Sequence, residues 1–309
     1  MNRKEIKATA KMRMAQSEPR YWNVMLVWLL AGIVLPGIAV CIGASPLSKW
    51  YSIVTLTGID PEHVWLLLQP ASGMLAVAVV LSVIVALYQI ILDFGLSAYS
   101  LRLYRGEPCG FATLFSGFGM AGRVLGARIL VGLFSLLWSL ALMVVLAVVL
   151  AVATWMPSAL MVFLFFAAYI GYFVALVAIL LRYSMVMLVL ADQPELGALG
   201  AIRRSKELMQ GYKGSYILLS LSFLGWGLLF LLIAVALAVG ALYGILFLGG
   251  MDITFLMGHF MLIDLGLNAV LWLGMLPITL WLEPYIMVSV AGFYEMLQPS
   301  TNQEELPLL

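Results

Sequence analysis

Residues 129–181 read ILVGLFSLLWSLALMVVLAVVLAVATWMPSALMVFLFFAAYIGYFVALVAILL and contain no charged residue, and Arg128 and Arg182 flank them. The tripeptide Trp155-Met156-Pro157 divides this segment into two apolar halves. Each half exceeds the roughly 20 residues that an α-helix needs to cross the hydrocarbon core of a bilayer. The segment therefore predicts two membrane-spanning helices joined by a short turn, with the arginine-bearing ends on the same side of the membrane.

The rest of the chain repeats this pattern of long apolar stretches. Hydrophobic residues make up 64% of the sequence and charged residues 10%, against roughly 25% charged residues in a soluble domain. We therefore predict an all-α, polytopic transmembrane helix bundle of about six spans, with amphipathic helices at the cytoplasmic interface. The apolar stretches are 22–43, 74–100, 124–151, 158–181, 215–248 and 254–297.

The basic residues alternate with these stretches. Of the 16 Lys and Arg residues, all but Lys49 and Arg128 fall before the first stretch, between the second and third, or between the fourth and fifth, and Arg128 lies near the start of the third. Because cytoplasmic loops carry an excess of Lys and Arg, this distribution predicts a multi-pass cell-membrane protein with both termini in the cytoplasm. The expected organisation is a basic cytoplasmic segment (1–20), a six-helix transmembrane domain (21–298) and a short acidic cytoplasmic tail (299–309).

Three short segments predict structure at the membrane surface. Residues 1–20 alternate basic and apolar side chains at roughly helical spacing, which fits either an amphipathic helix or a disordered basic tail. Four side chains between 111 and 118 recur at i, i+3, i+4 and i+7 and predict a second short helix. These four are Phe111, Leu114, Phe115 and Phe118.

The third segment predicts a basic amphipathic helix. Asp192 is expected to cap a helix over about 193–210, followed by Gly211 as the residue that ends it. Leu199, Ile202 and Met209 share one face of this helix. The cations near the other face are expected to contact anionic lipids of the cytoplasmic leaflet. These cations are Arg203, Arg204, Lys206 and Lys213.

A few acids lie deep in apolar sequence, where a charge is expensive and is therefore a functional-site hypothesis. Glu283 precedes Pro284, which interrupts helical hydrogen bonding, so its carboxyl is a candidate for binding a cation or relaying a proton. The alternative is a structural carboxyl that is protonated or paired with Arg. Asp93 is expected to pair with Arg128 or Arg182 between helices, with a role in transport as the alternative.

No catalytic signature is present. The sequence lacks the phosphate-cradling Gly-x-x-x-x-Gly-Lys-Ser/Thr, His-Glu-x-x-His and Gly-x-Ser-x-Gly motifs. Asp60-Pro61-Glu62-His63 offers three metal-ligating side chains, but Asp-Pro favours a turn and a single histidine is weak support for a metal site. We therefore assign no catalytic residue, no metal and no cofactor, although catalysis by carboxylates alone stays open. The small net charge of +1 argues against binding to nucleic acid.

Several short motifs follow one another along the chain: Arg105-Gly106-Glu107, Leu114-Phe115-Ser116-Gly117-Phe118, Ser205-x-x-Leu208-Met209-x-Gly211-Tyr212-Lys213, Ser220-Leu221-Ser222-Phe223-Leu224-Gly225-Trp226, Pro284-Tyr285 and Ala291-Gly292-Phe293-Tyr294. Together they resemble the bacterial membrane-protein family catalogued as domain of unknown function 975. The similarity covers most of 90–128 and 182–297, and it implies a location in the bacterial cell membrane. The chain departs from the family pattern in the long interval between Trp226 and Pro284, where 240–268 is expected to be an insertion, and in the acidic Glu283. The residues that match the family-like motifs include Gly211, Gly225, Trp226, Pro284 and Tyr285.

Three functions fit these observations. We rank first a non-enzymatic membrane component that binds lipid or a membrane-protein partner through its basic surface. The second is a transporter of small solutes or ions that uses Glu283 and Asp93. The third is a membrane-embedded hydrolase.

Overall fold

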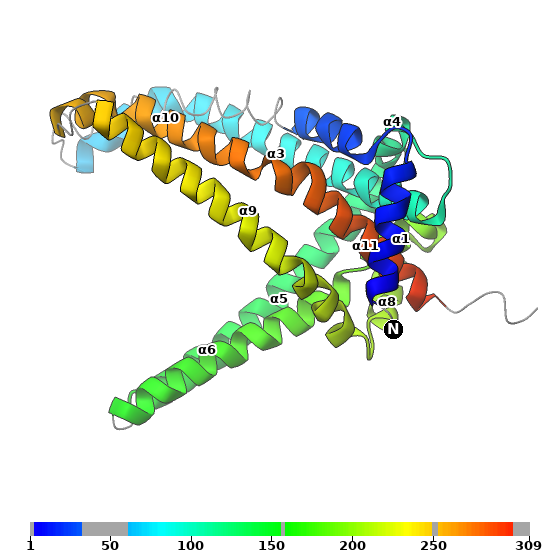
Figure 1. The fold of residues 1–309 in the computed structure, drawn as a ribbon. Coiled ribbons are helices and arrows are strands. Elements are labelled where there is room, and N and C mark those ends of the chain that lie inside the picture. The colour runs from blue at the N-terminus through cyan, green and yellow to red at the C-terminus, as the bar shows by residue number, and fades with distance from the viewer. Residues whose placement is uncertain (1–2, 33–60, 156–157, 249–252, 299–309) are drawn as a thin grey trace, which may run out of the picture.

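The computed structural model describes residues 3–32, 61–155, 158–248 and 253–298. Every regular element in those ranges is a helix. Figure 1 shows long helices that extend from a compact group of shorter helices at one end. Because the described basic segments gather there, we call this end the basic cap. It comprises α1 (Arg3–Gln16), α4 (Phe111–Leu114), the 3₁₀ turn η1 (Ser116–Met120), α7 (Val186–Asp192), α8 (Gly197–Leu208), α11 (Glu283–Leu297) and the part of α3 (Pro61–Arg105) that packs on them.

The charge-free segment forms the predicted hairpin. Helices α5 (Ala121–Ala153) and α6 (Ser158–Leu180) pack against each other along their length. Most of their apolar side chains point away from the protein, and Val144 and Phe163 are 64% and 66% exposed. Side chains this apolar are stable at a helix surface when acyl chains surround them, which agrees with a membrane span.

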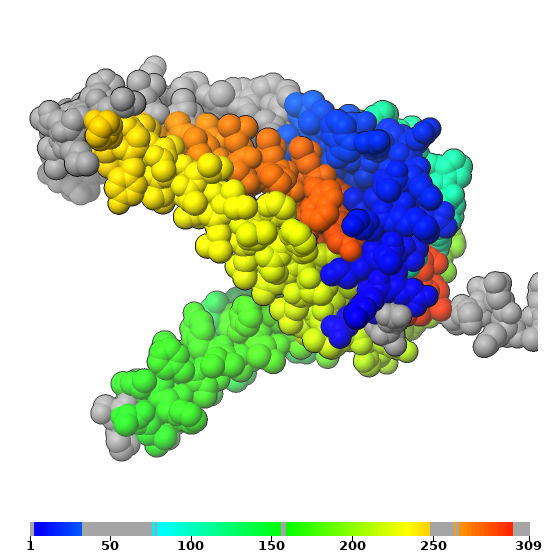
Figure 2. All heavy atoms as spheres, viewed as in Figure 1, coloured from blue at the N-terminus to red at the C-terminus, as the bar shows by residue number. Residues whose placement is uncertain are grey.

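A second pair of long helices leaves the basic cap in a different direction. Helices α9 (Lys213–Leu248) and α10 (Ile253–Pro277) pack on each other, and Figure 1 shows α3 running in the same general direction as this pair. The space-filling view shows the two arms of the molecule diverging with a hollow between them (Figure 2). The long helices of the bundle therefore form two arms that separate away from the basic cap.

The transmembrane fold class is confirmed by the length and apolarity of the helices. Within the described ranges, five segments are long and apolar enough to cross a membrane. The shorter Tyr21–Gly32 helix is also apolar, and the remainder of the first predicted stretch lies outside the described residues. The sixth span, like the tail over 299–309, therefore stays a prediction. The five segments are Val79–Arg105, Phe111–Ala153, Ala159–Asp192, Lys213–Phe247 and Gly266–Leu297.

The interruption predicted at Pro284 is present. Helix α10 ends at Pro277, a π-helical turn (η4) covers Ile278–Leu282, and α11 begins at Glu283. Each proline removes a backbone donor, and its ring displaces the carbonyl of the preceding turn. The widened turn between the two prolines accommodates this change, and π-helical turns are frequent at functional sites.

The N-terminal segment adopts the helical alternative. Helix α1 buries Ile6 and Ala10, which are 2% and 0% exposed. Ile6 joins an apolar core with residues of α3, α7, α8 and α11, and Ala10 joins a second one with residues of α3, α11 and the Tyr21–Gly32 helix. The basic side chains on the other positions of α1 stay toward its surface, so α1 is an amphipathic helix with its apolar face on the protein.

The bounds predicted for two of the surface helices are wrong. The helix expected over about 193–210 begins only at Gly197, after a 3₁₀ turn over Pro194–Leu196. Asp192 is not its cap, because its carboxylate binds side chains of α3 and α11 instead. The three residues expected to share one face differ in exposure, because Ile202 and Met209 are buried and Leu199 is 62% exposed.

The segment that contains the phenylalanines is also shorter than predicted. It forms one turn of α-helix, α4, followed by the 3₁₀ turn η1. Leu114 is fully buried, whereas Phe111, Phe115 and Phe118 are exposed. Glycines at 117 and 119 weaken a regular helix, and the buried Leu114 fixes this segment on α3 instead.

Candidate functional site

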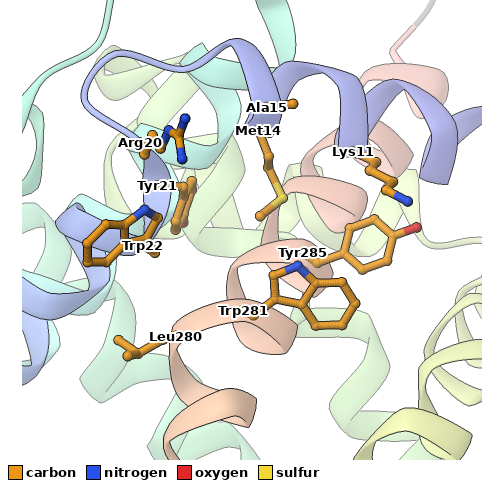
Figure 3. Close-up of a pocket in the computed structure, with 9 residues that line it drawn as sticks. All are labelled: Lys11, Met14, Ala15, Arg20, Tyr21, Trp22, Leu280, Trp281 and Tyr285. Atoms are coloured by element: carbon orange, nitrogen blue, oxygen red, sulfur yellow. The ribbon is translucent and has the colours of Figure 1, made fainter.

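A cavity of about 380 Å³ lies where the basic cap meets the long helices (Figure 3). Its lining comes from α1, from the start of the Tyr21–Gly32 helix, and from the π-helical turn with the beginning of α11. We call it the interfacial cavity. The lining residues are Lys11, Met14, Ala15, Arg20, Tyr21, Trp22, Leu280, Trp281 and Tyr285.

The spacing of residues on α1 builds one wall of this cavity. Lys11, Met14 and Ala15 stand at i, i+3 and i+4, so they share a helical face. Figure 3 shows the Met14 side chain reaching from α1 toward the rings of Trp281 and Tyr285. The cavity therefore has a mixed wall of charge and methionine on one side and an aromatic wall on the other.

The turn that joins α1 to the next helix is held firmly. The backbone N–H of Tyr21 donates to Ser17 Oγ at 3.2 Å, and the Tyr21 hydroxyl is 2.6 Å from Ser100 Oγ. The Tyr21 ring also packs edge-on against Tyr99, with 4.9 Å between centroids. These contacts fix the cavity wall to α3, so the cavity is largely pre-formed.

Helix α1 is attached to α9 and α11 through Lys7. The Lys7 ammonium donates to Ser222 Oγ at 3.0 Å and lies 4.2 Å from the centroid of the Phe223 ring. The Tyr285 hydroxyl donates to the Lys7 carbonyl at 3.3 Å. Burial, and to a smaller extent the Arg3 guanidinium, lowers the pKa of Lys7. Lys7 is therefore engaged in the fold rather than available to a ligand.

The two cations that line the cavity differ from Lys7. Lys11 and Arg20 are exposed, and neither forms an ion pair with any residue that the structure describes. Trp22 and Trp281, which line the same cavity, are 48% and 43% exposed. Indole rings favour the boundary between membrane and water, and free cations attract phosphate. The arrangement can hold an anionic headgroup beside the cations and an acyl chain against the indoles.

A second cavity, of about 460 Å³, brings the two predicted acids together. Asp93 on α3 and Glu283 at the start of α11 both line it, and so does Arg128 from α5. Arg182, the other partner considered for Asp93, is not part of the lining. We call it the carboxylate cavity. Its remaining lining residues are Trp28, Gln89, Ile90, Phe94, Leu96, Ser97, Met187 and Met287.

Neutral donors hold one side of the Asp93 carboxylate. Its Oδ1 atom accepts hydrogen bonds from Trp28 Nε1 at 3.2 Å and from Gln89 Nε2 at 3.3 Å. Among the described residues, no direct ion pair links Arg128 to Asp93 or Glu283. Asp93 and Arg128 therefore line the same cavity without forming the expected ion pair.

The four cations predicted to contact lipid occupy different environments. Arg203 is exposed on α8. Arg204 pairs with Glu207 at 3.4 Å. The Lys206 ammonium lies 5.4 Å from the ring centroids of both Phe134 and Tyr183, which attaches α8 to the α5–α6 hairpin. Lys213 begins α9, so the four do not form one site.

The family-like residues serve mainly to shape the chain around these cavities. Gly211 has a φ of +79°, a conformation that favours glycine, in the turn between α8 and α9. Trp226 packs edge-on against Trp281 of the interfacial cavity at 5.8 Å. Tyr285 lines that cavity and Pro284 is buried at the start of α11. Gly225 is different, because no neighbour would meet a Cβ atom there within 4 Å.

A polar cluster in the basic cap has a structural role. Arg105 at the end of α3 contacts Asp192 Oδ1 at 2.6 Å through Nη2 and Glu295 Oε1 at 2.7 Å through Nε. Tyr294 donates to the other oxygen of Asp192 at 2.9 Å. These contacts join the ends of α3, α7 and α11, and they satisfy the charges of the cluster within the protein.

Metal binding finds no support in the described side chains, where no three His, Cys, Asp or Glu residues form a group that could hold an ion. The side chains of Asp60, Glu62 and His63 lie outside the described residues. The residues that sequence reasoning missed are Lys11, Arg20, Trp22 and Trp281. Trp22 begins the first apolar stretch, and a tryptophan in that position was the available signal.

Comparison with known proteins places the chain in a family. No curated protein and no solved structure matches it. The family model described as "Protein of unknown function (DUF975)" matches residues 1–301, which includes both cavities and nearly the whole chain. The protein therefore belongs to the DUF975 family.

Proposed function

We propose that this protein is a non-enzymatic component of the bacterial cell membrane that binds anionic phospholipid through the interfacial cavity. The observation that carries the proposal is the combination, around one cavity, of two half-exposed indoles and two cations that form no ion pair within the described part of the chain. The headgroup phosphate lies between Lys11 and Arg20, and the upper part of an acyl chain lies along Trp22 and Trp281.

The proposal includes an orientation for the protein. With the basic cap in the cytoplasm, both termini are cytoplasmic and the interfacial cavity opens at the inner leaflet. The distribution of Lys and Arg supports this orientation, because such residues are enriched in cytoplasmic loops. The inner leaflet also carries the anionic lipids that the two cations would attract. Arg203 and Lys213 add general attraction to the same surface.

The test compares two double variants of equal charge. The full chain is purified in mild detergent, and binding of phosphatidylglycerol and phosphatidylcholine is measured by native mass spectrometry. The variant Lys11→Ala/Arg20→Ala removes the cations of the cavity. The control Lys4→Ala/Arg203→Ala removes two exposed cations that do not line it.

The cavity variant is expected to bind phosphatidylglycerol about thirtyfold more weakly, since each cation near a membrane surface contributes about 1 kcal/mol. The control is expected to retain most of its binding. If both variants lose phosphatidylglycerol equally, attraction is spread over the surface and the cavity is not the site. Equal binding of the two lipids by the unmodified protein would contradict the proposal altogether.

Transport of a small solute or ion is a second candidate function, and one observation favours it. Glu283 and Asp93 share a cavity beside a π-helical turn, the kind of helix interruption that lines binding sites in transporters. In proteoliposomes, a transporter is expected to dissipate an imposed proton gradient, and Glu283→Gln is expected to stop this without lowering thermal stability. A variant that only fails to accumulate would indicate a structural acid.

A further inference from the structure

The carboxylate cavity is lined by two acids and one arginine that form no ion pair with one another among the described residues. Asp93, Glu283 and Arg128 reach it from α3, α11 and α5, three helices that come from distant parts of the sequence. The contrast with Arg105 is informative, because Arg105 directly contacts two carboxylates and completes its own cluster. In the carboxylate cavity, no such direct pair forms among the described residues.

The two acids of this cavity have different surroundings. The hydrogen bonds from Trp28 and Gln89 both end on Asp93 Oδ1, which orients this carboxylate as an acceptor. Glu283 follows the π-helical turn directly, and Pro284 ends the normal hydrogen bonding at that point. Charges within apolar helices are expensive and mark functional sites when their placement is this specific.

The charges of the lining define the ligand. The two carboxylates, Asp93 and Glu283, favour an organic ammonium group, which can donate three hydrogen bonds. Arg128 favours a phosphate. A bare divalent metal fits less well, because Arg128 repels it and two carboxylates supply few of the six or more oxygens that such ions require.

We propose that the carboxylate cavity binds a phosphoethanolamine group, with its ammonium at Asp93 and Glu283 and its phosphate at Arg128. The cavity volume of about 460 Å³ is within the range of small-molecule sites. This chemistry has two sources, the headgroup of phosphatidylethanolamine and free phosphoethanolamine. The site is separate from the interfacial cavity and shares none of its lining residues.

The test uses the full chain in detergent. Binding of phosphatidylethanolamine and phosphatidylcholine is measured by native mass spectrometry, and binding of free phosphoethanolamine by calorimetry. Phosphatidylcholine carries a quaternary ammonium with no N–H donor, so it is the matched control ligand. The variants are Asp93→Asn, Glu283→Gln and Arg128→Gln, with Lys11→Ala/Arg20→Ala as the control outside this cavity. Thermal unfolding shows which variants are folded.

Phosphatidylethanolamine is expected to bind at least tenfold more tightly than phosphatidylcholine, and Glu283→Gln is expected to remove that preference. If Asp93→Asn does not fold, Glu283→Gln and Arg128→Gln still decide the matter. Binding of free phosphoethanolamine identifies a soluble source, and its absence alongside lipid binding identifies the lipid. Equal affinity for the two lipids without binding of free phosphoethanolamine, or an unchanged preference in all three variants, overturns the proposal.

The proposals for the two cavities are tested independently. Loss of phosphatidylglycerol binding in Lys11→Ala/Arg20→Ala reports only on the interfacial cavity. Loss of the phosphatidylethanolamine preference in Glu283→Gln reports only on the carboxylate cavity. Either result can therefore stand when the other does not.

Discussion

The basic cap and the α5–α6 hairpin are both helical, but they bury their side chains in opposite ways. In the cap, Met185, Ala201 and Phe293 are completely buried, and polar groups such as Arg105 find partners within the protein. In the hairpin, large apolar side chains are exposed along most of both helices. The cap is therefore stabilised by its own packing, as a soluble domain is, whereas the apolar surface of the hairpin needs lipid around it to be stable.

The largest expected effect tests how tightly the cap is packed. A Cβ atom at Gly95 on α3 would lie 1.8 Å from the Leu114 carbonyl oxygen, so Gly95→Leu forces α4 away from α3. We expect a loss of about 4 kcal/mol of stability, at the upper end for a single substitution. The matched change Gly132→Leu on α5 meets no neighbour within 4 Å and is expected to be nearly neutral. Thermal unfolding in detergent measures both, and similar losses would mean that the hairpin is packed as tightly as the cap.

The second prediction tests the surroundings of the hairpin. Val144 on α5 and Leu199 on α8 are similarly exposed, at 64% and 62%. An aspartate near the centre of a membrane span costs roughly 2.5–3.5 kcal/mol on insertion scales. We therefore expect Val144→Asp to reduce membrane insertion strongly and Leu199→Asp to have little effect. Equal insertion of the two variants in a glycosylation-based assay would show that Val144 does not face lipid.

The third and smallest effect concerns the charges of the cap. Arg105→Ala leaves Asp192 and Glu295 without their direct ionic partner, at positions where their side chains are 14% and 28% exposed. Because Arg105 itself is partly exposed, we expect a loss of about 1–2 kcal/mol. The control Arg204→Ala breaks an exposed pair and is expected to cost about 0.3 kcal/mol. Urea titration at low and high salt measures the loss of stability in both variants. A loss in Arg105→Ala no larger than the loss in Arg204→Ala would show that the Arg105 cluster does not stabilise the cap.

The sequence predicts the long helices well because the bilayer imposes a simple rule on them. Length and apolarity alone predict α5, α6 and α9, and Pro284 predicts the interruption of the helix near the start of α11. The short helices of the cap were harder to predict. Asp192 has the sequence context of a helix cap, but the Arg105 guanidinium and the Tyr294 hydroxyl compete for the same carboxylate. Tertiary contacts decided its role, and local sequence does not contain them.

The candidate sites follow the same division. Glu283 and Asp93 could be chosen from the sequence because an acid in an apolar stretch stands out. That they share one cavity with Arg128 could not be predicted, because these residues come from three different helices. Likewise, the interfacial cavity joins Lys11 and Arg20 to Trp281, across most of the length of the chain. No local pattern relates residues so far apart.

The attachment of α1 has a consequence for biosynthesis. Lys7 is translated near the start of the chain, yet the groups that it binds, Ser222, Phe223 and Tyr285, are among the later residues to leave the ribosome. At roughly 5–20 residues per second, α1 waits on the order of 15–60 s before α11 arrives. During that time Ile6 and Ala10 can pack only on the earlier part of their cores, such as α3, while the contacts of α1 with α9 and α11 are still missing. The docking of α1 is therefore completed late in the assembly of the protein, after α11 has been made.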